Sequence, residues 1–202
     1  TGIVMLPKKI LILLTFFIIS LSSIVKVYSI EPDIFVQSTV NRAAKTLGGN
    51  LTKGERIEEL KKIAKDTVDI NGIGNYTLGS YRKTISAAQI EQYKILFEKY
   101  FLKSFASRLA EYSNPEIEVT SKKKLSENYT MVSSILAGTE QRPEIKIDWR
   151  IYTKNKNTPV IRDLIIEGLS LARTQKEEFS SIIESNDGDI NALFTVLREF
   201  IK

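Results

Sequence analysis

The sequence predicts an α+β fold in which helices pack on one curved antiparallel sheet. Residues 145–167 have the alternating pattern of two strands joined by a polar turn. Helical periodicity precedes the strands, up to residue 112, and returns after residue 174. This segregation of helices and strands is the α+β arrangement, and it leaves room for a pocket between the two layers.

The predicted hairpin is the central element. Its first strand places apolar residues at every second position: Ile145, Ile147, Trp149 and Ile151. The polar segment Lys154–Pro159 forms the turn, and Val160–Glu167 is the return strand. We expect this strand to be more deeply buried at its far end, where Leu164, Ile165 and Ile166 run together. Gly168 then predicts a bulge or a sharp bend.

The first 29 residues have the pattern of a signal peptide. Their apolar run, Ile10–Ile19, follows two lysines, and small residues at a signal-peptidase spacing come later, at Val27 and Ser29. We expect cleavage after Ser29, with Ser22 as a second candidate, and a single domain over residues 30–202. An uncleaved membrane anchor is the alternative, although the run is shorter than the ~20 residues of a spanning helix.

Composition excludes several kinds of site. The chain has 202 residues, 43% of them hydrophobic, with 29 Lys and Arg against 24 Asp and Glu. Some of the excess lysines lie in the leader, so the remainder is close to neutral and a nucleic-acid partner is not expected. The basic run Lys122–Lys124 fits a solvated strand end or a contact with anionic headgroups. With no Cys and no His, thiolate chemistry and the commonest general base are missing.

Two helices are predicted before the strands. The first begins near Pro32 and ends before Gly48, and the second covers Glu55–Asp66 with one apolar face. Between Thr67 and Ser80 glycines interrupt the pattern, which indicates a short helix or an irregular crossing.

The strongest periodic signal is a helix that starts at a capping box of Ser86 and Gln89 and ends before Asn114. Aromatic and apolar residues follow at steps of mostly three and four: Ile90, Tyr93, Phe97, Tyr100, Phe101, Phe105, Leu109 and Tyr112. These side chains either fill the core of a small domain or line a lipid-sized cavity.

The remaining elements complete the expected order. Strands are predicted at Glu116–Lys122 and Asn128–Ala137. After the hairpin, a capping box at Thr174 and Glu177 predicts a short helix, and Asp189 caps a last amphipathic helix.

An ordered set of residues resembles the MlaC family, also called the toluene-tolerance family: Leu78, Gly79, Tyr81, Gln89, Tyr93, Phe97, Glu111, Tyr112, Asp163, Glu167, Gly168, Ser170, Leu171 and Phe179. Arg82, Pro159 and the pair Gln175 and Lys176 depart from the aromatic or basic residues usual in the family at or near these places. The resemblance implies a fold similar to nuclear transport factor 2, with acyl chains held inside and the headgroup outside.

The resemblance also implies a function. Members of this family are periplasmic phospholipid-binding proteins of an ABC lipid-transport system. We therefore expect a monomeric periplasmic carrier that shuttles phospholipid between an inner-membrane ABC transporter complex and an outer-membrane lipoprotein complex, maintaining outer-membrane lipid asymmetry. Such a carrier needs no catalytic residue, metal or cofactor.

The expected lipid-binding residues come from the aromatic helix, the segment before it and the strands: Tyr76, Leu78, Tyr81, Leu96, Phe97, Tyr100, Phe101, Phe105, Leu109, Ile135, Trp149, Ile151, Leu164, Ile166 and Leu169. Among them, the hairpin residues are expected to form a sheet wall opposite Phe97, Phe101 and Phe105.

Two other classes of function stay open. A small enzyme on the same fold could use a buried carboxylate of Asp69, Asp148 or Asp163, although we expect each acid to face solvent or to pair with Lys or Arg. A ligand-free interaction module with a packed core is the other. A cavity large enough for two acyl chains would exclude that module.

Overall fold

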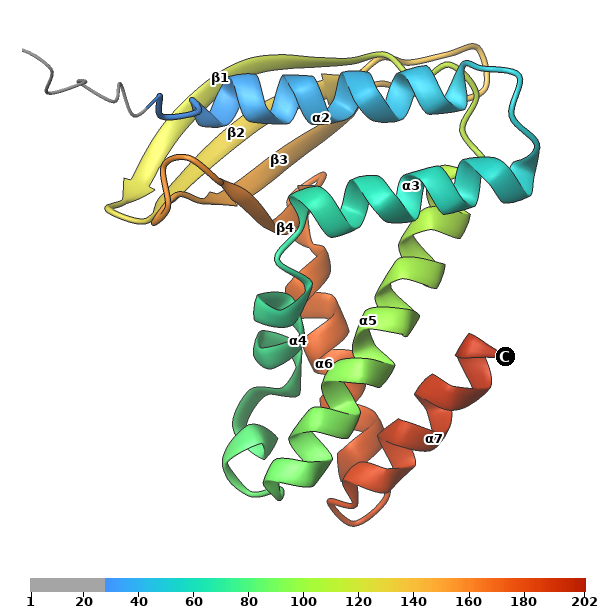
Figure 1. The fold of residues 1–202 in the computed structure, drawn as a ribbon, viewed down its shortest axis with the longest axis vertical. Helices are drawn as coiled ribbons and strands as arrows, with labels where there is room; N and C mark the ends of the chain where they lie inside the picture. Colours follow the sequence, from blue (N-terminus) through green and yellow to red (C-terminus); the bar gives the residue numbers. More distant parts are fainter. Residues whose placement is uncertain (1–27) are drawn as a thin grey trace, which may run out of the picture.

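The structure is a computed structural model that describes residues 28–202. Most of the expected signal peptide lies outside these residues. The sheet and α2 form one end of the molecule, the other helices extend away from them, and α3 lies between (Figure 1). The elements are α2 (Pro32–Leu47), α3 (Lys53–Thr67), α4 (Ile70–Leu78), the 3₁₀ helix η1 (Gly79–Lys83), α5 (Ala87–Leu109), β1 (Ile117–Ser126), β2 (Tyr129–Leu136), β3 (Ile145–Tyr152), β4 (Val160–Ile166), β5 (Leu169–Ser170), α6 (Leu171–Glu184) and α7 (Ile190–Ile201).

The five strands form one antiparallel sheet in the order β1-β2-β3-β4-β5, and this confirms the α+β prediction. The predicted hairpin is β3 and β4, with Trp149 opposite Leu164. Gly168 makes the expected sharp bend, because it and Glu167 form the turn into β5 with φ angles of 80° and 49°. Glycine adopts such left-handed angles without steric cost.

The expected burial of β4 is wrong. Ile161 and Asp163, near its start, are only 5% and 9% exposed, whereas Leu164–Ile166 are half-buried. The start of the strand is covered because Val68, just before α4, forms a parallel bridge with Ile161. The far end of β4 pairs with β3 on one side, but on its other side it has only the two-residue strand β5, so it lies near the edge of the sheet.

Helix α2 begins at Pro32 as predicted, since proline lacks the N–H that a first-turn residue leaves unpaired. It lies along the sheet in Figure 1. Its buried Val36 and Val40 pack in one cluster with Val132, Ile147 and other sheet residues. This helix therefore covers one part of the sheet, and the other part faces α5 and α6.

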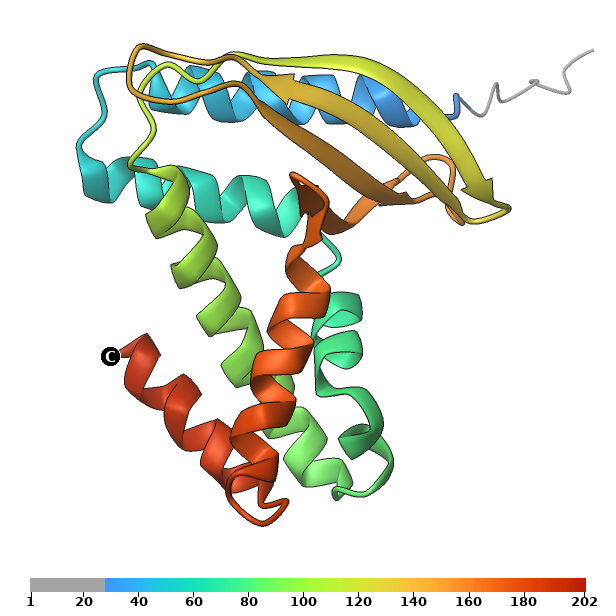
Figure 2. The ribbon, with the colours of Figure 1, turned by 180° about the vertical axis from the view of Figure 1, so that it is seen from behind.

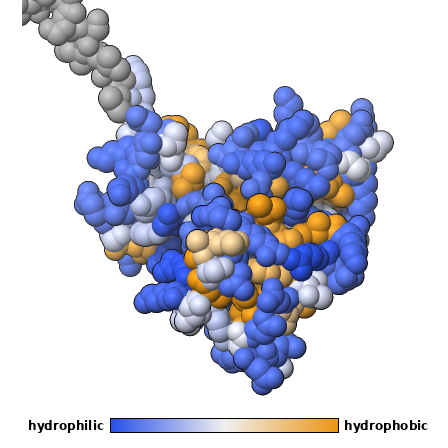
Figure 3. Space-filling model, turned by 60° about the horizontal axis from the view of Figure 1, so that its bottom comes forward, coloured by the Kyte–Doolittle hydropathy of each residue, from blue (hydrophilic) through white to orange (hydrophobic). Residues whose placement is uncertain are grey.

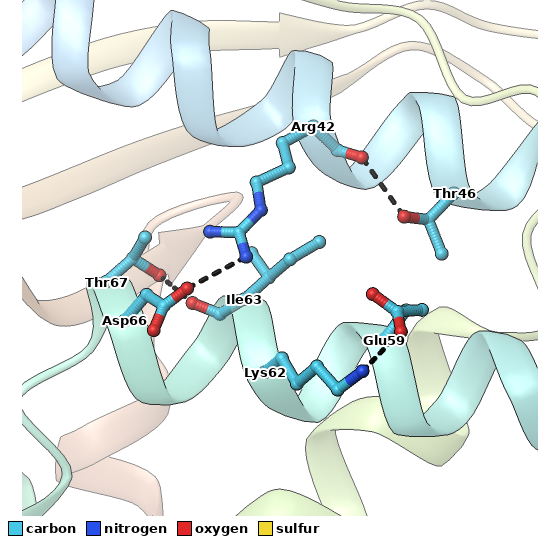
Figure 4. A network of polar contacts seen from close by, with 7 residues as sticks. All are labelled: Arg42, Thr46, Glu59, Lys62, Ile63, Asp66 and Thr67. Carbon is cyan, nitrogen blue, oxygen red and sulfur yellow. Dashed lines mark hydrogen bonds and ion pairs between the residues drawn. The ribbon is translucent and has the colours of Figure 1, made fainter.

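Helix α3 carries a capping box of Thr52 and Glu55. Its Leu60 and Ile63 pack against the end of α5. Arg42 of α2 and Asp66 of α3 form an ion pair of 2.8 Å between the two helices (Figure 4). Both side chains are about half exposed, so solvent screens the pair, and the buried apolar contacts account for most of the packing energy.

The glycine-rich segment forms α4, one of the two outcomes that the sequence left open. Asp69 caps it by accepting a hydrogen bond from the Gly72 N–H. Gly74 lies so close to Phe97 of α5 that a Cβ there would come within 2.8 Å of the ring. Gly74, one of the glycines that break the periodic pattern, therefore allows α4 to approach α5 closely.

The capping box of Ser86 and Gln89 starts α5 as predicted, but the helix ends at Leu109, earlier than expected. Asn114, with a φ of 47°, is already outside it. Helix α6 begins at Leu171 with Ser170 as its cap, and not at Thr174. Asp189 caps α7, as expected.

Helices α4, α5 and α6 meet in an aromatic core. Tyr93 and Phe97 of α5 each make an edge contact with Phe179 of α6, at 6.4 and 6.3 Å between ring centroids. The Tyr93 hydroxyl lies 2.7 Å from the Thr77 hydroxyl of α4, and both residues are 1% exposed. Since Thr77 donates to the Gly74 carbonyl, Tyr93 is the donor to Thr77.

Burial raises the pKa of Tyr93 above its ordinary value. The unfolded chain loses this phenolic proton above about pH 10, while the folded protein keeps it. The contribution to stability is therefore complete below that pH and falls as pH rises further.

We expect Tyr93→Phe to lower the free energy of unfolding by about 1 kcal/mol at neutral pH, and to lose less stability than wild type as pH rises above about 10, measured by urea unfolding. Tyr76→Phe, which removes an exposed phenol, is the control. If Tyr93→Phe loses as much stability at alkaline pH as the wild type, the loss does not come from the Tyr93 phenol.

Candidate functional site

A cavity of about 200 Å³ lies between the sheet and the helices α5 and α6. Seen from behind, α5 and α6 meet at the far end of the molecule and spread apart toward the sheet (Figure 2). The cavity is lined from β3, β4, α4, α5, α6 and the link before α4 by these residues: Val68, Ile73, Phe97, Tyr100, Phe101, Ser104, Phe105, Arg108, Trp149, Ile161, Asp163, Leu164, Leu171, Ala172, Thr174, Gln175 and Glu178.

The α5 wall is aromatic because three phenylalanines recur at four-residue steps along one face of the helix. Phe101 and Phe105 stack with centroids 5.5 Å apart and an interplanar angle of 11°. Phe97 lies 6.1 Å from Phe101 and is 2% exposed, whereas Phe101 and Phe105 are half-buried. The wall is thus anchored in the aromatic core at Phe97 and open toward the cavity at Phe105.

The sheet wall is formed around Trp149 of β3, which is 7% exposed. Its indole N–H donates to the Ser134 hydroxyl at 2.8 Å, and that hydroxyl donates to the Ile147 carbonyl at 2.9 Å. Because the only polar atom of the ring is satisfied inside the sheet, the rest of the indole is an apolar surface. Leu164, its cross-strand partner, extends this surface.

Polar residues of α5 and α6 lie on the solvent side of the cavity. Tyr100 donates a hydrogen bond to Gln175 Oε1 at 2.9 Å, and Gln175 Nε2 donates to Glu178 Oε2 at 3.0 Å. Burial raises the pKa of the Tyr100 phenol, which keeps it a neutral donor. Arg108 is exposed at the same rim. An apolar interior with a polar edge suits a ligand with a hydrocarbon body and a polar head.

The three acids considered for catalysis have different surroundings. Asp69 pairs with Arg162 at 2.8 Å, and Asp148 lies 3.5 Å from the Lys146 ammonium. Asp163 is only 9% exposed and forms no ion pair with a Lys or Arg of residues 28–202. The expectation that each acid faces solvent or pairs with a base is therefore wrong for Asp163.

Asp163 instead fixes the start of α6. Its two carboxylate oxygens accept hydrogen bonds from the Ser170 hydroxyl and from the Ala172 N–H, the latter at 3.0 Å. The first N–H groups of a helix have no partner within it and favour a negative charge nearby. This arrangement binds α6 to β4 across the bend at Gly168, and engages both oxygens.

The size of the cavity differs from expectation. Pockets for drug-sized ligands are typically about 300–1,000 Å³, and a phospholipid with two acyl chains is larger than such ligands. At about 200 Å³, the cavity does not enclose two acyl chains in this conformation. Its size therefore does not exclude a ligand-free interaction module.

The structure brings some of the expected site residues together. Those that line the cavity are Phe97, Tyr100, Phe101, Phe105, Trp149 and Leu164. Leu78 and Ile151 are fully buried in the packed core. Tyr81 and Leu96 are half-buried against the helical core, Ile166 against the sheet cluster, and Leu109 against the cluster under α3.

Three expected residues lie elsewhere on the molecule. Leu169 is 57% exposed in the short edge strand, and Tyr76 is 45% exposed on α4. Ile135 lines a separate hollow beside α2. For Ile135 the reason is the two-residue period of β2, because Val132, Ser134 and Leu136 take the inward positions.

Neither a metal site nor a membrane span occurs in the part of the chain that the structure describes. No cluster of His, Cys, Asp or Glu within residues 28–202 could hold a metal ion. None of the helices there combines the length and the apolar character of a membrane-spanning segment. Apolar side chains are nevertheless visible at the surface, where Figure 3 shows them gathered among hydrophilic ones.

Residues 36–199 match the family model described as MlaC protein. This chain belongs to the MlaC family. The family resemblance in the sequence is thereby confirmed. An MlaC relative from Haemophilus influenzae, the intermembrane phospholipid transport system binding protein MlaC, is 24% identical over 194 residues, which cover 92% of this chain and 88% of the relative.

A solved structure supports the fold of this MlaC-family chain. It is the phospholipid-binding protein from Ralstonia solanacearum in complex with a phospholipid, with a TM-score of 0.71 and 18% identity. The match covers 85% of this chain and 97% of that one. At this identity the likeness shows that the two proteins share a fold.

Sequence reasoning missed the cavity residues contributed by the connecting segments and by α6. Val68 and Ile73 lie where glycines disturb the helical pattern, and Leu171 and Ala172 lie where the start of α6 was placed too late. Ser170, three residues before Arg173, is the signal that could have placed it, because its hydroxyl accepts from the Arg173 N–H.

Proposed function

We propose that this MlaC-family protein is a carrier that binds a phospholipid by its acyl chains. The main support for this proposal is the cavity between the aromatic face of α5 and the sheet wall at Trp149, with polar groups on its solvent side. The names of the two relatives, one a phospholipid transport binding protein and the other a phospholipid-binding protein, support this ligand class. Such a function needs no catalytic group.

The physical need for a carrier follows from hydrocarbon hydration. Each methylene exposed to water costs about 0.8 kcal/mol, so two acyl chains oppose free passage between membranes by about 20 kcal/mol or more. An apolar cavity removes most of this cost. Because the cavity and a bilayer are both apolar, transfer between them is nearly balanced. Direction must then come from the donor and acceptor complexes.

The cavity has to widen to hold two acyl chains. Phe179 of α6 packs against Tyr93, Phe97 and the ring of Tyr100 where α5 and α6 meet. At the cavity rim, the hydrogen bond from the Tyr100 hydroxyl to Gln175 is a polar link between the two helices. Such a bond contributes only about 0.5–1.5 kcal/mol. We infer that α5 and α6 separate at the rim while the aromatic core stays packed.

The cellular setting is also part of the proposal. The protein acts as a periplasmic monomer that exchanges phospholipid with an inner-membrane ABC transporter complex and an outer-membrane lipoprotein complex, and so helps to maintain outer-membrane lipid asymmetry. The relative's role in an intermembrane transport system supports this setting.

A ligand-free interaction module is the second candidate, and the small volume of the cavity favours it. Native mass spectrometry of protein released from the periplasm distinguishes the two. We expect co-purified phospholipid, and its absence from freshly released protein favours the module.

For export, we expect residues 1–29 to be removed as a signal peptide, which leaves a mature chain that starts near Ile30, just before α2. Mass spectrometry of the osmotic-shock fraction gives the mature N-terminus. A full-length product that pellets with membranes would instead indicate an uncleaved anchor.

Phe105→Asp places a charge in the α5 wall and should remove most co-purified phospholipid, because a carboxylate is costly against hydrocarbon. Ile95→Asp introduces the same charge on the same helix at a position that is 59% exposed, and should retain lipid. Circular dichroism and thermal unfolding check that both variants fold. Equal lipid content in the two folded variants rules out contact of acyl chains with Phe105.

A further inference from the structure

A second surface feature lies beside the cavity, on the face made by α4, η1, β3, β4 and α6. Three hollows there share residues of their linings, since Tyr76 borders all three, Arg162 borders two and Lys176 borders two. The three hollows therefore lie side by side around Tyr76. We call them together the basic groove after the basic residues that border it: Arg82, Lys83, Arg150, Arg162, Arg173 and Lys176.

Most of these charges are not neutralised. Only Arg162 has an acidic partner within residues 28–202, namely Asp69 at 2.8 Å. The acids that border the groove are Asp163, which is committed to the start of α6, and Glu177 and Glu184, which line the same hollow on α6 as Arg173 and Lys176 and so offset only part of the positive charge. The groove therefore has a local excess of positive charge, although the domain as a whole is nearly neutral.

Aromatic rings hold several of these cations in place. The Arg162 guanidinium lies 3.7 Å from the centroid of Tyr152 and also donates a hydrogen bond to the Tyr129 hydroxyl. Arg150 lies 5.3 Å from the Tyr129 ring, and Lys176 lies 5.1 Å from the ring of Tyr76. Cation–π contacts of this kind limit side-chain freedom, so less entropy is lost when an anion binds.

The groove is next to the acyl cavity. Ile73, Asp163 and Ala172 border both the cavity and the groove, so the two are separated by a single layer of side chains. A membrane or protein that binds in the groove is therefore separated from the cavity by that single layer of side chains.

We propose that the basic groove binds the phosphate groups of anionic phospholipids, so that this face of the protein docks on an acidic membrane. Arginine forks and lysine ammonium groups are the usual phosphate partners in proteins. Tyr76, which is 45% exposed at the centre of the groove, is a residue type enriched at the membrane–water interface. Lysine, which the groove has at Lys83 and Lys176, is in contrast depleted at protein–protein interfaces. This site is additional to the acyl cavity.

Vesicle flotation at low ionic strength tests the proposal. The wild-type mature protein should float with phosphatidylglycerol vesicles, should not float with phosphatidylcholine vesicles, and should be released by added salt. Arg173→Glu/Lys176→Glu should weaken binding about tenfold or more, since each basic residue near an anionic membrane is worth about 1 kcal/mol. Lys45→Glu/Lys99→Glu makes the same change in net charge at exposed positions outside both the groove and the basic run Lys122–Lys124, and should bind nearly as well as wild type.

Equal losses in the two double variants would show that only net charge matters and would overturn the proposal. So would failure of the wild type to bind phosphatidylglycerol vesicles. Binding to soluble poly-glutamate without binding to vesicles would assign the groove to acidic protein segments, and also contradicts the proposal. Phe105→Asp should still float with anionic vesicles, and the groove variant should keep its co-purified lipid, so the cavity and the groove can fail separately.

Discussion

The packing of Phe97 is the contact on which the rest of the helical half depends. Its ring is 2% exposed, lies against Gly74 of α4 and makes an edge contact with Phe179 of α6. Three helices are thereby joined at one end. Since the sheet occupies the other end, α5 and α6 spread toward it, and the space between them is the cavity. Helix α5 thus contributes both to the aromatic core, through Phe97, and to the cavity wall, through Phe101 and Phe105.

Polar contacts attach this helical half to the sheet at two points. Arg162 of β4 pairs with Asp69, which also caps α4. Asp163, the next residue of β4, accepts hydrogen bonds from Ser170 and Ala172 at the start of α6. Two adjacent residues of one strand therefore position the helices on either side. One result is that the apolar cavity and the basic groove lie back to back.

The sequence predicted what periodicity and capping control. The β3–β4 hairpin, the capping box of Ser86 and the cap at Asp189 are local signals, and each is confirmed. The sequence correctly predicted that Phe97, Phe101 and Phe105 line the same cavity as Trp149, because α5 and β3 both have regular faces. The other predictions failed where tertiary contacts decide. The burial of β4 depends on a distant bridge to Val68, and the volume of the cavity depends on how closely α5 and α6 approach.

The central claim is that acyl chains lie between α5 and the sheet wall. Trp149 tests it most directly, because it is the only tryptophan of the chain and lines the cavity. Its fluorescence should shift to longer wavelength, or become more accessible to acrylamide, when lipid is stripped from the folded protein. Adding phospholipid should reverse the change. Identical spectra and quenching with and without lipid would place Trp149 in a permanently packed core and contradict the account.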